Sequence, residues 1–345
     1  MNQSKLKLDL NESSSEPKYK QLAQSITENI ELGHLKPGDQ LPSITQLSID
    51  YLVSRDTVEK AYKILRQQGV IESVKGKGFY VLISSPKSKL RVFVLFNKLS
   101  SYKKVIYNTL AYELREKANL ELFVYHCNLD LFESYISDKV GRYNYYVIMS
   151  HFDTPDKARI ATAINNIPPD KLILLDNIIE GVDKYKGAVY QDFKADIYEA
   201  LNEGLPQLKK YKKIIFIFPE NVPYPYPKLI VDGFKRFCAI NRFSFEVLNE
   251  LDEDHTIEHG TAYLLIEEND LAELIKKIRS QGLVIAKDIG IISYNDTPLK
   301  EVLLAGISVV TTDFQQLGAN TAKIILNQLD GEIKNNFKLI LRNTL

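Results

Sequence analysis

Residues 41–81 restrict the fold of this 345-residue chain more than any other segment. Ser43 stands three residues before Gln46, a capping-box spacing that predicts a helix beginning at Ile44. Ser54 is a second N-cap, and apolar residues recur after it at helical spacing. A hairpin signal follows, with glycines at its tip. Two short helices, a tight turn and a hairpin in this order predict a winged helix-turn-helix, which places one helix in the major groove of DNA.

The helix that follows Ser54 and the hairpin tip carry the residues that are suited to contact DNA. The apolar residues of the helix follow the i, i+3, i+4, i+7 pattern and are expected to face inward. Arg55 begins the opposite face, where a cation can reach phosphates and base edges. Lys75 and Lys77 flank Gly76 at the hairpin tip, a position from which lysines reach the minor groove or its phosphates.

Charge is distributed unevenly along the chain. The whole sequence has 44 basic and 44 acidic residues, so its net charge is zero. Between residues 52 and 89, however, eight basic residues stand against three acidic ones, which gives this stretch a charge of +5. A solvated run of charges would be the alternative interpretation, but the motif around it favours a basic face that binds nucleic acid.

Residues 17–82 resemble the DNA-binding domain of the GntR family of bacterial transcription regulators. The matching strings are YKQLAQSI (residues 19–26), GHLKPGDQLPS (33–43), VSRDTVEKAYKIL (53–65) and GVIESVKGKGFYV (69–81). In that family the starts of the second and third helices and the wing tip contact DNA. With the caps and lysines above, this predicts the contact residues Ser43, Thr45, Ser54, Arg55, Thr57, Lys75, Gly76 and Lys77.

Three of these positions qualify the predicted contacts. Thr45 stands where the family often has an arginine, and a threonine cannot make a bidentate contact with guanine. The operator preference is therefore expected to differ at that base. For Ser43 and Ser54, helix capping alone is the alternative role, although a capping hydroxyl can also contact a phosphate.

The rest of the chain has a different pattern, in which short apolar runs alternate with amphipathic helical segments. The runs occupy residues 92–96, 120–125, 145–150, 171–176, 213–218, 262–267 and 289–295. Such alternation predicts parallel sheets with crossover helices, and about 255 residues suffice for two doubly wound lobes. The expected fold is α/β, with a flexible tail over residues 1–16, the winged helix-turn-helix over 17–82, a linker over 83–90 and a two-lobed sensing and dimerisation domain over 91–345.

This second part resembles the sugar-sensing core of the LacI family, which is related to periplasmic sugar-binding proteins. The most specific string is IGIISYNDTPLKEVLLAGISVVTTDFQQLGANTAKIIL (residues 289–326), with LILRNTL (339–345) as the family's closing strand. YQDF (190–193) and VDGFKRF (231–237) are further matches. A GntR-type head on a LacI-like body is similar to the arabinose-type repressors.

In parallel sheets ligands bind beyond the carboxyl ends of the strands, so the residues after each run are the candidates. The resemblance places Asp192 and Asn295 on the sugar, with Asp296 next to Asn295 as a contact or a turn cap. Ile230 stands where the sugar readers usually have an arginine, which makes Lys228 the candidate substitute. The predicted ligand-binding residues are Phe96, Asn97, Tyr102, His151, Asp192, Lys228, Asn295 and Asp296.

Several other classes of protein are disfavoured. The sequence contains no run of about 18 apolar residues, so no membrane span is expected. The first 20 residues lack the pattern of a secretion signal. Cys127 and Cys238 have no metal-ligand spacing, and a disulfide between them is not expected. No motif of a pyridoxal enzyme, a nucleophile elbow, a phosphate loop or a zinc protease occurs. A glycosidase-type enzyme that uses carboxylates of the cleft stays open as the alternative.

The sequence therefore predicts a cytoplasmic, homodimeric regulator without a cofactor or metal that binds double-stranded operator DNA. We expect it to repress carbohydrate-utilisation genes and to bind a neutral monosaccharide between the two lobes of its second part.

Overall fold

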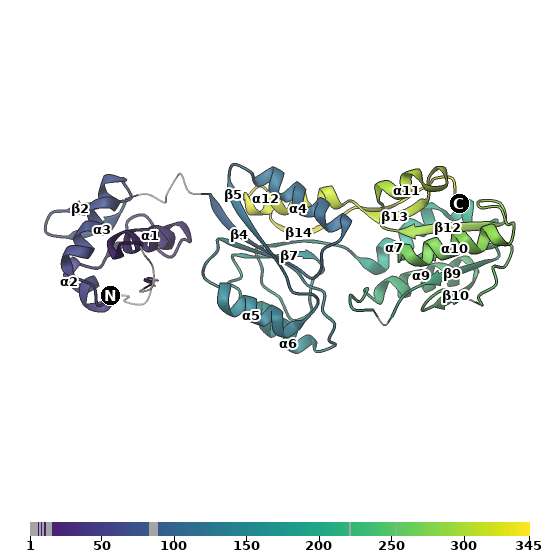
Figure 1. Ribbon diagram of the computed structural model, residues 1–345, viewed down its shortest axis with the longest axis horizontal. Helices are drawn as coiled ribbons and strands as arrows, with labels where there is room; N and C mark the ends of the chain where they lie inside the picture. Colours follow the sequence, from purple (N-terminus) through teal and green to yellow (C-terminus); the bar gives the residue numbers. More distant parts are fainter. Residues whose placement is uncertain are drawn as a thin grey trace. The chain divides into compact units, whose positions relative to one another are not determined.

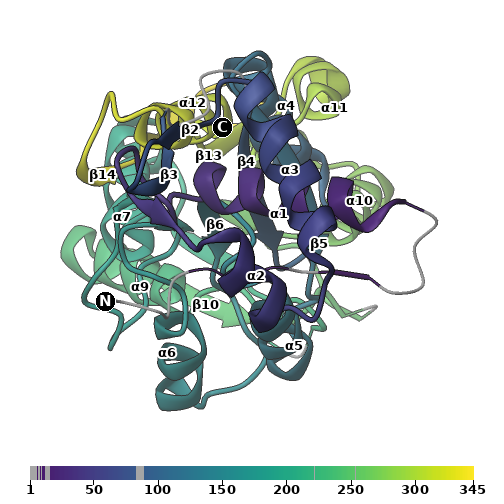
Figure 2. The same ribbon diagram turned by 90° about the vertical axis from the view of Figure 1, so that its left-hand side faces the viewer.

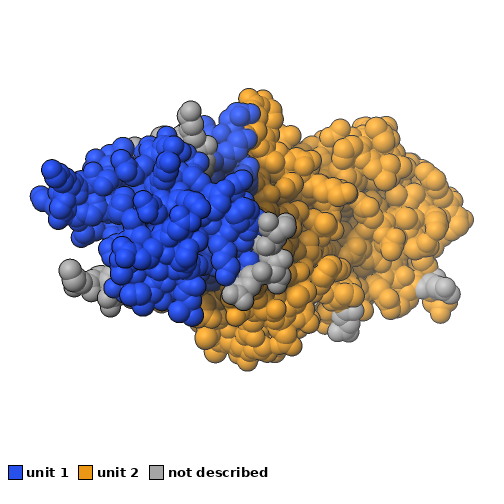
Figure 3. Space-filling model, turned by 60° about the vertical axis from the view of Figure 1, so that its left-hand side comes forward, with its two compact units in different colours: residues 1–92, 116–119, 139–145 blue, residues 93–115, 120–138, 146–345 orange. Residues whose placement is uncertain are grey.

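The computed structural model describes residues 6, 8, 10–11, 16–82, 89–220, 222–252 and 254–345. The chain divides into two compact units, one made of residues 1–92, 116–119 and 139–145 and the other of residues 93–115, 120–138 and 146–345 (Figure 3). Most of the predicted tail and most of the predicted linker, residues 83–88, lie outside the described residues. The last residue of that linker, Leu90, already begins a strand.

The amino-terminal part is a helical domain with a small sheet (Figure 2). Its elements are α1 (Lys18–Glu31), β1 (Gln40–Leu41), α2 (Ile44–Asp50), α3 (Arg55–Gln67), β2 (Ile71–Val74) and β3 (Gly78–Val81). The strands form an antiparallel sheet in the order β1-β3-β2. Both predicted helix starts are confirmed, because the Ser43 hydroxyl accepts from Gln46 N and the Ser54 hydroxyl accepts from Thr57 N, each at 3.1 Å.

One apolar core holds this domain together. Leu22 and Ile26 of α1, Leu47 of α2 and Val58 of α3 are each fully buried in it. The Tyr62 hydroxyl donates to the backbone oxygen of Pro42 at 2.7 Å, which fixes α3 against the segment before α2. Within the predicted tail, the described residues Leu6, Leu8 and Leu10 are partly buried against the same core.

The second part has two lobes, each built on a six-stranded sheet (Figure 1). The first lobe has the strand order β14-β8-β7-β6-β4-β5, and the β6–β7, β7–β8 and β8–β14 pairs are parallel. Its elements are β4 (Leu90–Phe96), α4 (Ser101–Leu114), β5 (Ala118–Val124), α5 (Leu129–Lys139), β6 (Tyr145–Met149), α6 (Lys157–Asn165), β7 (Leu172–Asp176), β8 (Gly187–Tyr190), α12 (Phe314–Ile325) and β14 (Gly331–Lys334).

The second lobe has the strand order β10-β9-β11-β12-β13-β15, in which only the β13–β15 pair is antiparallel. Its elements are α7 (Phe193–Glu203), α8 (Leu205–Leu208), β9 (Lys213–Ile217), α9 (Leu229–Asn241), β10 (Ser244–Leu248), β11 (Thr261–Leu265), α10 (Glu268–Ser280), β12 (Ile289–Tyr294), α11 (Pro298–Val302), the 3₁₀ turn η1 (Leu303–Ala305), β13 (Ser308–Thr312) and β15 (Phe337–Ile340). The predicted α/β fold, a winged helix-turn-helix followed by two parallel-sheet lobes, is confirmed.

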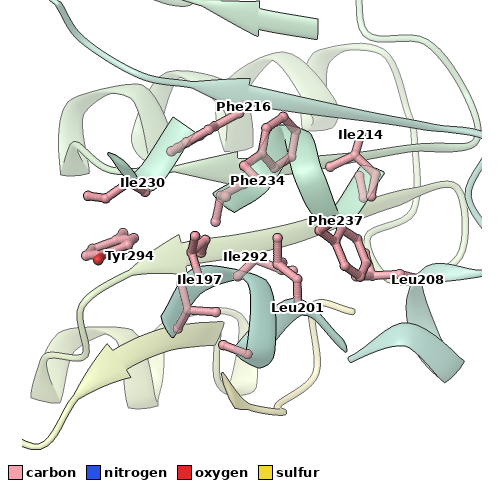
Figure 4. Close-up of a cluster of buried hydrophobic side chains, with 14 of the residues drawn as sticks. Ile197, Leu201, Leu208, Ile214, Phe216, Ile230, Phe234, Phe237, Ile292 and Tyr294 are labelled. Atoms are coloured by element: carbon pink, nitrogen blue, oxygen red, sulfur yellow. The ribbon is translucent and has the colours of Figure 1, made fainter. Parts of the chain in front are cut away.

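Each sheet is covered by helices, and the second lobe shows how the layers pack. The ring of Phe216 on β9 contacts that of Phe234 on α9, with centroids 5.1 Å apart. Phe237 of α9 and Ile197 of α7 belong to the same buried cluster (Figure 4). Gly233 of α9 permits this packing, because a Cβ added there would lie 2.2 Å from the backbone oxygen of Lys194.

The chain passes between the two lobes three times, after β8, after β13 and after β14. Asn335, which is buried, connects all three crossings. Its backbone N–H donates to the Tyr190 oxygen at 2.7 Å, and its side-chain amide donates to Thr312 Oγ1 at 2.8 Å and to the Asp313 oxygen at 2.9 Å. A change in the angle between the lobes must therefore change the geometry of the hydrogen bonds that Asn335 makes.

Candidate functional site

The residues predicted to contact DNA lie at the starts of α2 and α3 and at the tip of the β2–β3 hairpin. Thr45 and Arg55 are exposed in the first turns of their helices. Ser54 and Thr57 lie together, since their hydroxyl oxygens are 2.8 Å apart. Arg55 is the first residue of α3 and its guanidinium lies in solvent, as a phosphate or base contact requires.

The hairpin tip has a defined conformation. Gly76 and Gly78 have φ values of +74° and +107°, which residues with a side chain rarely adopt. The Gln40 side chain donates to the backbone oxygen of Lys77 at 2.7 Å and holds the tip against β1. Lys75 and Lys77 are both exposed on this turn, so the tip presents two cations to solvent.

A second candidate site is a cavity between the two lobes, beyond the carboxyl ends of their strands. Its inner part has a volume of about 60 Å³ and adjoins a crevice of about 330 Å³. Lys98, Tyr102, Tyr226, Tyr294 and Asn295 line both spaces, so the two form one continuous site. The crevice falls within the range of about 300–1,000 Å³ that is typical of small-molecule sites.

Asp176 is a hydrogen-bond acceptor in the lining of the inner cavity. It is the last residue of β7, it is buried, and its φ of +74° is unusual for a residue with a side chain. His151 Nε2 lies 2.7 Å from one carboxylate oxygen, and the Gln191 amide donates to the other. Burial raises the pKa of Asp176, but its hydrogen bond with His151 and the nearby charge of Lys103 outweigh burial, so the net pKa is lowered. The carboxylate is therefore ionised at neutral pH.

Lys103 of α4 is the corresponding donor. Only 6% of the residue is exposed, and its ammonium donates to the Asn97 side-chain oxygen. Burial lowers the pKa of Lys103 to about 8, an effect that the charge of Asp176 opposes and the charge of Lys98 reinforces. The cavity thus holds a buried ammonium and a buried carboxylate that interact with each other.

Aromatic rings line the site, among them those of Tyr102, Tyr226 and Tyr294. The Lys98 ammonium lies 5.1 Å from the ring centroid of Tyr224 and 5.0 Å from that of Tyr226, within the range of cation–π interactions. The Tyr226 hydroxyl donates to Glu267 at 2.6 Å. Tyr102 stacks on Phe314 with ring centroids 5.0 Å apart. Such rings can cover the apolar C–H face of a sugar.

The structure brings together four of the eight residues predicted to bind the ligand. Asn97, Tyr102, His151 and Asn295 line the cavity. It does not place the other four there. Phe96, the last residue of β4, is fully buried and is not part of the cavity lining. The carboxylate of Asp192 caps α7, accepting from Ala195 N at 3.0 Å.

The remaining two predicted residues are also absent from the lining. Asp296 forms a bidentate pair with Arg342, with distances of 2.9 and 2.6 Å. Lys228 is exposed at the start of α9 and does not line the cavity, whereas Ile230 two residues later does.

Four polar side chains of the inner cavity are absent from the residues predicted from the sequence, namely Lys98, Lys103, Asp176 and Gln191. Two of them had a detectable signal. Asp176 is the final residue of the apolar run 171–176, where the strand ends. Lys103 shares the buried stripe of α4 with Ile106 and Leu110, and a lysine on an apolar stripe indicates a buried cation. Gln191 had no comparable signal.

Within the described residues, no cluster of three or more His, Cys, Asp or Glu side chains could hold a metal ion. The helices described in the structure include none with the length and apolarity needed to cross a membrane.

Comparison with known proteins adds a match at the amino-terminal end. The family described as bacterial regulatory proteins, gntR family, matches residues 18–81. The HTH-type transcriptional repressor YtrA of Bacillus subtilis is 43% identical over 68 residues, which are 20% of this chain and 52% of YtrA. The chain thus spans about half the length of this relative. The uncharacterised HTH-type regulator YhcF of the same organism is 31% identical over 24% of this chain and 72% of YhcF.

Two further similarities extend over the second part. The arabinose metabolism transcriptional repressor of Geobacillus stearothermophilus is 21% identical over 95% of this chain and 97% of that protein. The crystal structure of the lac repressor dimer bound to operator and the anti-inducer ONPF superposes with a TM-score of 0.59. It is 15% identical and covers 75% of this chain and 95% of the other, so it shows a shared fold.

Proposed function

This chain belongs to the gntR family of bacterial regulatory proteins, and on that premise we propose that it is a sequence-specific transcription regulator that represses carbohydrate-utilisation genes. A small sugar bound between the two lobes controls its affinity for operator DNA. A relative that matches 95% of this chain is named a repressor of arabinose metabolism, which supports the carbohydrate assignment.

The observation that carries this proposal is the lining of the interlobe cavity. Buried donors and acceptors, including Lys103, Asp176 and Asn97, lie beside the aromatic rings of Tyr226 and Tyr294. Hydroxyl groups of a sugar both donate and accept hydrogen bonds, and its C–H face is apolar, so the lining suits both surfaces. We expect the ligand to be a neutral monosaccharide.

Regulation follows from the two-lobed architecture. A sugar held by both lobes favours the closed form only by its differential affinity for that form. In a homodimer, closure changes the spacing of the two heads, each of which reads one half of a near-palindromic operator. A coupling of about 1–3 kcal/mol is typical and changes operator affinity by about 5- to 150-fold. We place this activity in the cytoplasm, where the operator is.

The alternative of a glycosidase-type enzyme has less support. Such enzymes usually need two carboxyl groups that flank the scissile bond, one of them protonated. Asp176 is the only carboxylate among the described residues that line the inner cavity, and its lowered pKa keeps it ionised. Glu267 and Glu268 line only the adjoining crevice, where Glu267 accepts from the Tyr226 hydroxyl. The lining therefore fits ligand binding better than acid–base chemistry.

The direct test is a gel shift with the full chain and the DNA upstream of its own gene. The measurement is repeated with pentoses, hexoses, deoxyhexoses and their phosphates. We expect a specific complex whose affinity one sugar changes at least 5-fold. A chain that binds this DNA with the same affinity in the presence of every sugar, and that shows no sugar binding by calorimetry, would disprove the assignment of the second part.

A further inference from the structure

The two lobes contribute different chemistry to the inner cavity. All charged side chains of its described lining come from the first lobe, and they are Lys98, Lys103 and Asp176. The second lobe contributes mostly apolar and aromatic groups, among them Phe193, Tyr226, Ile230 and Tyr294. A ligand in this cavity therefore meets polar groups on one side and an apolar wall on the other.

On the polar side, Lys103 and Asp176 have unused hydrogen-bonding capacity. An ammonium carries three donors, and the described structure gives Lys103 a single acceptor, Asn97. A carboxylate has about four lone-pair sites, and Asp176 accepts from Gln191 and pairs with His151. Both side chains are buried and line the same cavity, so a ligand in this cavity can complete their hydrogen bonds.

We propose that Lys103 and Asp176 bind the same hydroxyl of a neutral sugar, with the ammonium donating to the hydroxyl oxygen and the hydroxyl donating to the carboxylate. This inference rests on the proposed function and identifies Lys103 as the anchor of the ligand. Asp176 is the counter-charge of Lys103, and the Lys98 ammonium lies over the rings of Tyr224 and Tyr226 with the charge of Glu267 nearby. An acidic group on the sugar would therefore meet the like charge of Asp176 as well as the ammonium groups. The unhydroxylated face of the ring then lies against Ile230 and Tyr226 of the second lobe.

The test uses calorimetric titration of the full chain with neutral aldoses, with glucuronic acid and with glucose 6-phosphate. The variants are Lys103→Met and, as a matched control, Lys104→Met, which changes the exposed next residue of the same helix. We expect a neutral sugar to bind and its affinity to fall about 10- to 100-fold in Lys103→Met, because a charge-assisted hydrogen bond is lost. Lys104→Met should bind as the unchanged chain does.

Asp176→Asn and the double variant complete a thermodynamic cycle. If both side chains hold one hydroxyl, the double variant should lose clearly less affinity than the sum of the two single losses predicts. Thermal unfolding and operator binding of each variant establish that the chain is folded.

The pH dependence is an independent readout of Lys103. The charged and titratable groups that face it are Asp176 on β7, His151 after β6, Cys127 after β5 and Lys98 after β4. Because the pKa of Lys103 in the free chain is about 8, sugar affinity should fall as the pH rises above 8. This fall should be absent in Lys103→Met and present in Lys98→Met, which separates the two lysines.

The outcomes separate this inference from the proposed function. Failure of the chain to bind any of these sugars would contradict both. Binding of a neutral sugar with equal affinity in Lys103→Met, or preference for an acidic sugar, would overturn the role of the Lys103–Asp176 pair and leave the regulator assignment standing.

Discussion

At the scale of single residues, burial decides what each cation of this chain can do. Arg55 lies in solvent at the start of α3, where it can exchange water for a phosphate or a base edge. Lys103 is enclosed in the cavity, where only a ligand of matching shape reaches it. On the proposed function, the same kind of charge serves DNA in one place and a small molecule in the other.

Replacing Arg55 by alanine should weaken operator binding by about 1–3 kcal/mol, or about 5- to 150-fold, because a base or phosphate contact is lost. Sugar affinity should not change. The measurement is fluorescence anisotropy with labelled operator at fixed salt. Arg66→Ala, an exposed cation in the last turn of the same helix, is the matched control. An equal loss in both variants would show that only the general charge of α3 matters.

Asp196 on α7 gives a prediction for stability against pH. Burial raises its pKa to about 6, and the hydrogen bond from Lys334 opposes this only in part. Since the unfolded value is about 3.9, the folded chain binds the proton more tightly, and stability falls as the pH rises from about 4 through 6. Asp196→Asn should remove this dependence and raise the melting temperature at pH 8. Thermal unfolding at pH 5 and pH 8 measures both effects, and a lower melting temperature of the variant at pH 8 would refute the argument.

At the scale of elements, close helix packing depends on small residues. Helices α7 and α9 approach each other at Gly233, where an added Cβ would lie 2.2 Å from the Lys194 oxygen and 2.4 Å from Ile197 Cγ2. Gly318 of α12 has the same role against α4, with 2.6 Å to the Ile106 oxygen. These contacts fix the positions of α7 and α4, the helices on which the cavity residues Phe193 and Lys103 lie.

Gly233→Ala should therefore lower the free energy of unfolding by about 1–3 kcal/mol, since backbone has to move to accept the methyl group. Chemical denaturation monitored by circular dichroism measures the change. Lys235→Ala, at an exposed position of the same helix, should change stability by less than about 0.5 kcal/mol. Equal stability of Gly233→Ala and the unchanged chain would mean that α7 and α9 can separate without cost.

At the scale of the whole molecule, Asn335 holds the three crossings between the lobes. Its side chain donates to one crossing at Thr312 and Asp313, while its backbone donates to another at Tyr190. The side-chain oxygen of Asn335 has no partner among the described residues, although it is buried. Because its hydrogen bonds join the crossings, Asn335 can bias the equilibrium between open and closed forms.

Asn335→Ala should lower stability by about 1–3 kcal/mol, because a partly buried acceptor at Asp313 is left unpaired. It should also reduce the change in operator affinity that the sugar causes, since the crossings are no longer tied together. Anisotropy with and without the sugar measures this ratio. Asn336→Ala replaces an exposed neighbour and should keep both properties. An unchanged ratio in Asn335→Ala would exclude a role of this residue in the coupling.

The sequence by itself determined the elements and the order of the domains. Helix starts at Ile44 and Arg55 follow from the serines before them, and the strands of both lobes follow from apolar runs. These signals act between residues a few positions apart, so they are readable without the fold. Even the burial of Lys103 was contained in the helical period of α4.

Only the tertiary structure decided which polar residues share the cavity. Asp176 meets His151 and Gln191 because β6, β7 and β8 are neighbours in one sheet, a fact that spacing along the chain does not contain. Asp192 stands directly beside Gln191 in the sequence, yet it caps a helix instead. The direction of a side chain after a strand depends on packing between lobes, and that packing is a property of the folded chain alone.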